Sequence, residues 1–228
     1  MKHIAVAGLF AAGILAAQAA GAATTVNIKW QGLDTSGTKL STMDTTVSST
    51  TPITSNYATS ALNYTNLDTG SSFVAYCVEP LQGNGRAGIA RAYSVESFGG
   101  VQAQQLQGLF STAYAGLSTY NDKAAFQLAV WEMVLETGST LDVNSGSFHI
   151  SSTDAVSTQV ASEANSFLAQ ALAYTGPARY TLTKLTNPQL QDLITATPLS
   201  AVPEPESYAL FLGGLGIVGL LVRRRLPR

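Results

Sequence analysis

Hydrophobic residues in the middle of the chain change their spacing twice, and this constrains the fold more than any other feature of the sequence. Residues 24–30 alternate between apolar and polar, as a half-buried strand does. Residues 32–60 are rich in Ser and Thr, so edge strands and loops are expected there. Residues 71–78 carry apolar side chains on both faces, which is typical of a strand buried on both sides. After a helical block, residues 179–186 return to the alternating pattern.

Three helices are expected in the block between these strands. Apolar residues recur at helical spacing over residues 101–117 and again over residues 154–174. The segment 123–136 is apolar almost all round, which predicts a helix that is buried on every side. The order of strands, helices and strands predicts an α+β fold: a single domain of antiparallel β-sheet with an inserted helical block.

The composition agrees with one folded domain. The chain has 228 residues, of which 46% are hydrophobic and 11% charged. This is enough apolar material for a core and too little charge for a disordered acidic or basic chain. Between residues 23 and 202, 7 Lys and Arg stand against 12 Asp and Glu, and 7 − 12 gives a net charge of −5. Because phosphate binding needs clustered cations, we expect no nucleic-acid partner.

Residues 1–22 have the parts of a secretory signal peptide. Lys2 gives a basic start, residues 4–17 are apolar, and small residues follow. Cleavage is expected after Ala19 or Ala22. A membrane anchor or a buried helix is the alternative, but the apolar run is short for a bilayer and no stop-transfer pattern follows.

The last residues combine a short motif, an apolar run and a basic end. The motif is formed by Pro203, Glu204 and Pro205. Residues 208–222 are apolar and would just reach across a thin hydrocarbon layer. The basic end contains Arg223, Arg224 and Arg225, which would hold it on the cytoplasmic side. A permanent single-span anchor is one interpretation of this tail.

The tail, residues 201–228, also resembles the PEP-CTERM sorting signal of Gram-negative bacteria. The resemblance implies export across the inner membrane and transient anchoring through residues 208–222. It further implies processing at the motif by an exosortase-type membrane enzyme, after which the protein is at the cell surface or extracellular.

The chain has one cysteine, Cys77, so an internal disulfide, an iron–sulfur cluster and a cysteine zinc site are excluded. An unpaired cysteine in an exported protein indicates intermolecular pairing or a reactive thiol, unless it is simply a small buried hydrophobe. Gln127 lies in the most apolar helical segment, where an amide without partners costs about 1–3 kcal/mol. The amide can hydrogen bond to a backbone edge. Alternatively, its carbonyl can condense with a cysteine thiolate and form an internal thioester.

Two motifs in this order resemble the thioester domains of bacterial surface adhesins. The motifs are Tyr76-Cys77-Val78-Glu79 and Phe126-Gln127-Leu128-Ala129-Val130-Trp131. The resemblance implies that Cys77 and Gln127 are joined as a thioester, whose Gln-derived carbonyl is attacked by an external amine. Trp131 is expected to pack over the bond and exclude water, with Tyr76, Glu79 and Phe126 around it.

These observations predict an exported surface or extracellular-matrix protein whose domain, residues 23–200, attaches covalently to a protein or polysaccharide. Since the carbonyl of Gln127 is consumed, the chain would be a single-use acyl donor rather than an enzyme, with no cofactor. A non-reactive structural or binding component of the matrix, with Cys77 simply buried, is the alternative.

Other polar residues are weaker candidates. A cysteine hydrolase would need His149, the only histidine after the signal peptide, but residues 147–150 have a strand pattern and no hydrolase motif surrounds the cysteine. Glu132 and Glu136 share a helix face without a histidine at useful spacing, so no metal site is expected and both should lie on a solvated edge.

Overall fold

The computed structural model describes residues 24–34, 43–45, 53–55, 59–80, 82–137, 139–150, 154–199, 210 and 212–215. Its strands are β1 (Thr25–Leu33), β2 (Met43–Thr45), β3 (Ile53–Ser55), β4 (Leu62–Asn66), β5 (Ser72–Cys77), β6 (Ala90–Glu96), β7 (Tyr180–Asn187) and β8 (Leu190–Pro198). Its helices are α1 (Gly100–Thr112), the short 3-10 helix η1 (Tyr114–Gly116), α2 (Tyr120–Leu135) and α3 (Ala155–Leu172).

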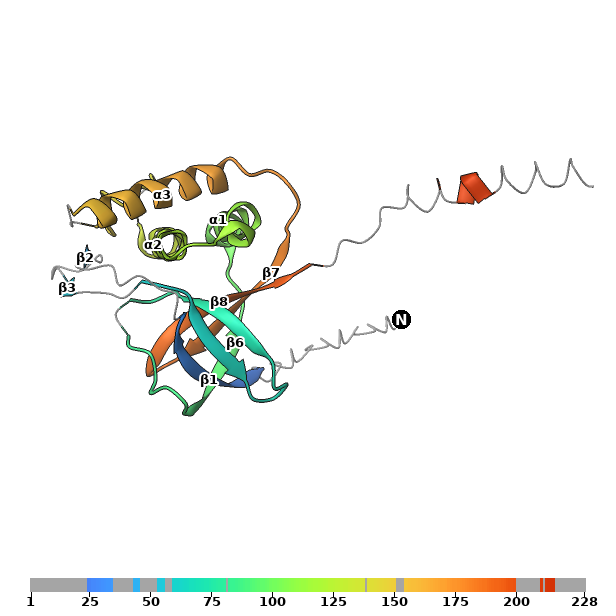
Figure 1. The fold of residues 1–228 in the computed structure, drawn as a ribbon, viewed down its shortest axis with the longest axis horizontal. Helices are drawn as coiled ribbons and strands as arrows, with labels where there is room; N and C mark the ends of the chain where they lie inside the picture. Colours follow the sequence, from blue (N-terminus) through green and yellow to red (C-terminus); the bar gives the residue numbers. More distant parts are fainter. Residues whose placement is uncertain are drawn as a thin grey trace, which may run out of the picture.

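The described strands form a closed antiparallel barrel in the order β1-β4-β5-β8-β7-β6, and β2 and β3 pair separately. The barrel closes where Val26 of β1 pairs with Tyr93 of β6. The helices lie together on one side of the barrel (Figure 1). They are inserted between β6 and β7, so the predicted α+β class and inserted helical block are confirmed. Closure of the sheet into a barrel was not predicted.

Helix α2 occupies the centre of the helical layer. It packs against α1, α3 and β5, and every residue from Ala124 to Met133 is buried, as the sequence predicts. Thr119 and Asp122 begin the helix with a capping box, in which each side chain accepts a hydrogen bond from the backbone N–H of the other. Lys123 forms an ion pair with Asp34, which follows β1. These contacts fix the position of α2 over the barrel.

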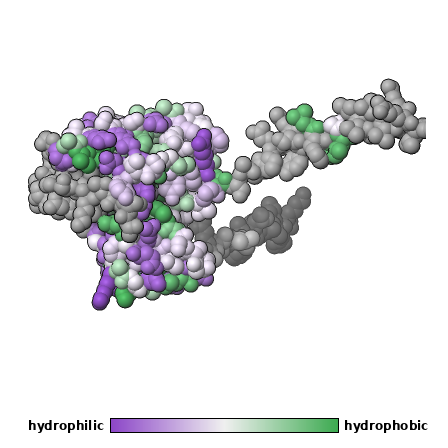
Figure 2. Space-filling view, in the orientation of Figure 1, coloured by the Kyte–Doolittle hydropathy of each residue, from purple (hydrophilic) through white to green (hydrophobic). Residues whose placement is uncertain are grey.

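The surface in Figure 2 shows hydrophilic and weakly polar residues over most of the helical layer in view, with apolar residues in small separate patches. No helix within the described ranges is both long and apolar enough to cross a membrane. The predicted signal peptide and most of the predicted span over residues 208–222 lie outside those ranges.

Candidate functional site

The structure brings Cys77 and Gln127 together at the end of β5, beneath α2. Both are buried, with 3% and 1% of their surface exposed. The Cys77 backbone N–H donates to Gln127 Oε1 at 2.7 Å, and Gln127 Nε2 donates to the Cys77 carbonyl oxygen at 2.7 Å. The side-chain amide is therefore held directly against the backbone of the cysteine.

The strand register explains why this backbone is free to bind an amide. Strand β4 pairs with β5 only as far as Leu62 and Ala75, whereas β8 continues alongside to the pair of Cys77 with Leu193. The edge of Cys77 on the β4 side therefore has no strand neighbour in the described pairing, and Gln127 supplies the missing donor and acceptor. The N–H of Cys77 also polarises the Gln127 carbonyl, as an oxyanion-hole donor does.

Gln191 Nε2 donates to Cys77 Sγ, and the Trp131 side chain and the Glu79 backbone lie near the thiol. Burial raises the pKa of the Cys77 thiol well above its usual range; the neighbouring Trp131 side chain and Glu79 backbone oppose this effect, and the charges of Glu79 and Asp192 add to it. The resting thiol is therefore uncharged.

Aromatic side chains close the site on the helical side. The rings of Tyr76 and Phe126 lie with centroids 4.7 Å apart, and Phe126 meets Phe110 edge-on at 4.9 Å. Trp131 is 3% exposed and packs against Phe148 at 6.1 Å. Each of these residues is buried, so they keep bulk water away from the Cys77 and Gln127 side chains.

Glu79 is only half-buried. Its carboxylate accepts from Gln82 Nε2 at 3.0 Å, while its backbone faces the sulfur.

Sequence reasoning missed Gln191. It lies on β8, for which no strand was predicted, and its neighbours Leu190 and Asp192 give no motif around it. The hydroxyls of Tyr64 and Tyr93 were also missed. Tyr64 donates to Asn84 Oδ1 and Tyr93 to the Gln191 carbonyl oxygen, each at 3.3 Å; burial, with a further contribution from nearby Cys77, raises the pKa of both. Only the pairing of β5 with β8, and of β4 and β6 with β1, brings these residues to the cysteine.

The expectation of a solvated edge is wrong for Glu132, which is completely buried. Its Oε1 accepts from the Asp142 backbone N–H at 2.7 Å. Glu136 accepts from the backbone N–H groups of Ser147 and Phe148 at 2.6 and 3.3 Å. The loop after α2 therefore folds back over both carboxylates, and within the described ranges no cluster of acidic, His or Cys side chains could hold a metal ion.

The predicted strand over residues 147–150 is also wrong. Residues 147 and 148 form bends, and of the four only Ile150 makes an isolated bridge; the Ile150 N–H also donates to Val143 O at 2.8 Å. His149 Nδ1 lies 3.1 Å from the carbonyl oxygen of Gly146. The hydrogen bond described at Cys77 Sγ comes from Gln191, so the geometry gives no support to a Cys77–His149 pair.

Glu132 makes stability depend on pH. Burial raises its pKa to about 7. The hydrogen bond from the Asp142 backbone lowers the pKa, and the charge of Glu136 raises it further. Since the folded pKa is raised above the ordinary 4.5, folding favours the protonated acid. The loss of stability relative to low pH is absent below about pH 4.5. It grows as the pH rises to about 7 and reaches its full size above that pH.

We therefore expect the free energy of unfolding of Glu132→Gln, relative to that of the wild type, to rise by on the order of 3 kcal/mol between pH 4.5 and 8. Each pKa unit corresponds to about 1.4 kcal/mol. Urea unfolding at a series of pH values measures this difference. Glu96→Gln, at an exposed carboxylate, is the control and should show no such gain. A parallel pH dependence for Glu132→Gln and the wild type would contradict the prediction.

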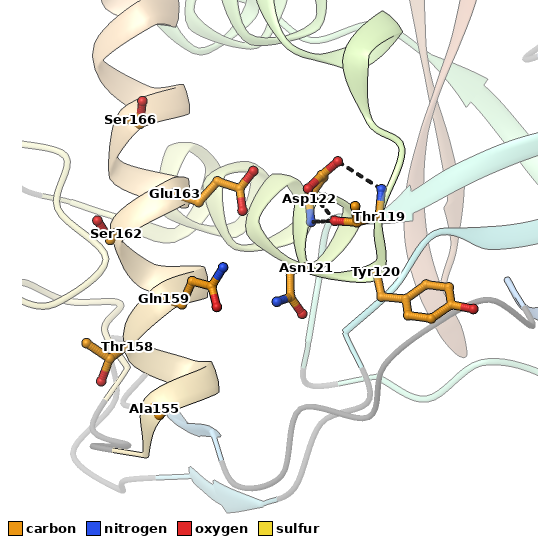
Figure 3. Close-up of a pocket in the computed structure, with 10 residues that line it drawn as sticks. All are labelled: Thr119, Tyr120, Asn121, Asp122, Ala155, Thr158, Gln159, Ser162, Glu163 and Ser166. Carbon is orange, nitrogen blue, oxygen red and sulfur yellow. Dashed lines mark hydrogen bonds between the residues drawn. The ribbon is translucent and has the colours of Figure 1, made fainter.

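A hollow lies between the start of α2 and α3 (Figure 3). It has a volume of about 1100 Å³ and is lined by Thr119, Tyr120, Asn121, Asp122, Ala155, Thr158, Gln159, Ser162, Glu163 and Ser166. Burial, and next the charge of Asp122, raises the pKa of Glu163. None of these lining residues hydrogen bonds to Cys77, so this polar hollow is separate from the thiol site.

Comparison with solved structures finds bacterial surface proteins. The N-terminal domain of the Streptococcus pyogenes pilus tip adhesin Cpa aligns with 69% of this chain and 93% of its own, at 16% identity and a TM-score of 0.43. The N-terminal thioester domain of a surface protein from Clostridium perfringens aligns with 77% of this chain and 100% of its own, at 14% identity and a TM-score of 0.46. No curated protein matches the sequence at a significant level.

The end of the chain gives a direct family match. Residues 201–225 match the PEP-CTERM protein-sorting motif, and they include the Pro203-Glu204-Pro205 sequence and the first arginines of the basic end. This motif implies an exported protein that is anchored transiently, processed by an exosortase and then located at the surface. The chain therefore carries a PEP-CTERM sorting signal at its C-terminal end.

Proposed function

We propose that this protein is an exported surface or matrix protein that attaches covalently to its partner through an internal thioester between Cys77 and Gln127. The observation that supports it is the pair of hydrogen bonds, each 2.7 Å long, between the Gln127 amide and the Cys77 backbone. They hold the amide against the backbone of the only cysteine of the chain in a buried site, while the side-chain amide that contacts Sγ is that of Gln191.

The bond forms by exchange of the Gln127 amide nitrogen for sulfur. Sγ attacks Cδ of Gln127, the Cδ–Sγ bond forms, and the Cδ–Nε2 bond breaks. The thiol proton goes to the departing nitrogen, which leaves as ammonia. The Cys77 N–H that binds Oε1 stabilises the negative charge that develops on this oxygen during the attack.

Attachment reverses the roles of sulfur and nitrogen. A nucleophilic amine or hydroxyl attacks Cδ, its bond to Cδ forms, and the Cδ–Sγ bond breaks. Sulfur leaves with the electron pair and takes up the proton that the nucleophile loses. A thiolate leaves far more readily than an amine, and the dry surroundings of Phe126 and Trp131 protect the bond from water. The Gln127 carbonyl is consumed, so each molecule acts once.

The regions of the chain fit this function. Residues 1–22 serve as the signal peptide, residues 23–200 form the thioester domain, and residues 201–228 are the sorting signal. Export is followed by transient insertion of residues 208–222 in the inner membrane and by exosortase processing. The domain then meets a surface or matrix protein or polysaccharide, in adhesion or in the assembly of a biofilm matrix.

One observation favours the alternative of a non-reactive matrix component. The Gln127 amide has both its oxygen and its nitrogen paired with the Cys77 backbone, so it can stay buried without condensing.

Intact mass separates the two functions. We expect the purified wild-type domain to be lighter than its calculated mass by one ammonia, because condensation expels the Gln127 nitrogen. Cys77→Ala and Gln127→Ala should each show full mass for their own sequence. A wild-type domain of full mass, with a thiol that titrates completely after unfolding, would show that the thioester does not form.

A further inference from the structure

The described side chains do not fill the closed barrel at the end away from Cys77. A cavity of about 260 Å³ lies inside the barrel, and residues from all six barrel strands line it. We call it the barrel cavity. On β5 it is lined by Phe73, four residues before Cys77, so it begins about 13 Å along the strand from the cysteine at about 3.3 Å per residue. Side chains normally fill a barrel with so few strands, so this space is unusual.

One part of the cavity wall is apolar. Ile28 and Leu185 are 1% and 3% exposed. Val26, Phe73 and Val95 also line the cavity, yet each is only half-buried. Side chains inside a filled barrel would be covered completely. Their partial exposure means that the barrel cavity opens to solvent and that a ligand can enter it.

The rest of the wall carries neutral hydrogen-bonding groups. They belong to Asn66, Ser71, Thr183, Thr195 and Thr197. The Thr195 hydroxyl donates to the carbonyl oxygen of Val74 at 2.8 Å, so its oxygen can still accept a hydrogen bond. Within the described ranges the hydroxyls of Thr183 and Thr197 make no hydrogen bond. Valine would fill the same space without a polar group, so the threonines add hydroxyls that packing does not need.

These properties define the chemistry of a ligand. No residue that lines the barrel cavity is charged, so the wall cannot compensate the burial of an ion. The volume of about 260 Å³ is below the range of about 300–1,000 Å³ for drug-sized ligands, so one small ring fits. Hydroxyls that both donate and accept match a ligand with several hydroxyls of its own. The apolar wall can cover a face of C–H groups.

We propose that the barrel cavity is a binding site for one neutral sugar ring, whose C–H face packs against Phe73 and whose hydroxyls bond to the threonines. The site is separate from Cys77 and does not depend on the thioester. A sugar held here is therefore not the group that Gln127 acylates. The domain has a non-covalent site at one end of the barrel and the Cys77 site at the other.

Saturation-transfer NMR on the purified protein tests this site. The probes are the neutral methyl glycosides of glucose, galactose, mannose and N-acetylglucosamine, with methyl glucuronide as the charged counterpart of the first. We expect at least one neutral glycoside to bind and the glucuronide to bind more weakly than the glucoside, because the wall has no cation. Failure of all four neutral probes to bind, or tighter binding of the glucuronide, would overturn the proposal.

Variants of the wall place the ligand in the barrel cavity. Thr183→Val keeps the shape and removes one hydroxyl, so the affinity should fall about threefold to tenfold. Thr25→Val, at an exposed position of β1, is the matched control and should bind as the wild type. Val95→Phe should fill the cavity and abolish binding, with its unfolding midpoint as the check on folding. Equal affinities for Thr183→Val and Thr25→Val, or binding by a folded Val95→Phe, would exclude this site.

Two further comparisons define the result. Cys77→Ala should bind the glycoside as the wild type does, so sugar binding and the thioester can succeed or fail separately. A free sugar and the terminal ring of a polysaccharide have the same chemistry. Binding of the linear trisaccharide of the best sugar, as tight as that of its methyl glycoside, would identify a polysaccharide end as the ligand. Binding of the methyl glycoside alone would identify a free sugar.

Discussion

Methylamine is expected to add to the wild-type domain and to release one thiol per molecule. The amine nitrogen bonds to Cδ of Gln127, the Cδ–Sγ bond breaks, and the proton lost by nitrogen is transferred to sulfur. The effect is all-or-none, because a glutamine amide does not exchange with a dilute amine under the same conditions, whereas a thioester carries a good leaving group. Intact mass and thiol titration, taken before and after treatment, measure it.

Two variants control this experiment. Gln127→Ala removes the acyl group and should neither gain mass nor release a thiol beyond the one it already has. Gln159→Ala, at an exposed glutamine of α3, should behave as the wild type. A wild type that takes up no methylamine, and whose thiol is already titratable before treatment, would rule out a reactive thioester.

Phe126→Ala is expected to destabilise the domain by about 3–5 kcal/mol, a large share of the 5–15 kcal/mol that holds a typical domain folded. Phe126 is fully buried, and its ring lies with centroids 4.7, 4.9 and 5.8 Å from those of Tyr76, Phe110 and Tyr114. Removing it leaves a cavity that these rings cannot close without leaving their positions. Urea unfolding measures the loss.

The same substitution should let water reach the thioester, because Phe126 precedes Gln127 on α2. We expect the ammonia-deficient mass to be replaced, over time, by the mass of the hydrolysed chain, which is heavier by one water. Tyr120→Ala, at the first and exposed residue of the helix, serves as the control and should alter stability by less than about 1 kcal/mol. A Phe126→Ala domain as stable as this control would contradict the assignment of Phe126 to the core.

The helices followed from the sequence because their pattern is local. Residues 123–136, apolar all round, became the buried helix α2, and the stripe over residues 154–174 became α3, with Asp154 accepting from the backbone N–H groups of Val156 and Ser157. Strands β4, β6 and β8 were not predicted. In β6, for example, only Tyr93 is buried, so no alternation marks the strand. Its place is decided by pairing with β1 and β7, far away in the sequence.

The sequence by itself determined the chemistry that is possible: one thiol, one glutamine in an apolar helix, aromatic residues beside both, and a sorting motif at the end of the chain. These are properties of residue type and short-range order. The tertiary structure decided the environment. The end of the β4 pairing exposed the backbone edge of Cys77 to Gln127, the loop after α2 buried Glu132, and the pairing of β5 with β8 brought Gln191 to the sulfur. Burial and hydrogen bonding depend on contacts between distant segments, so a local pattern could not have shown them.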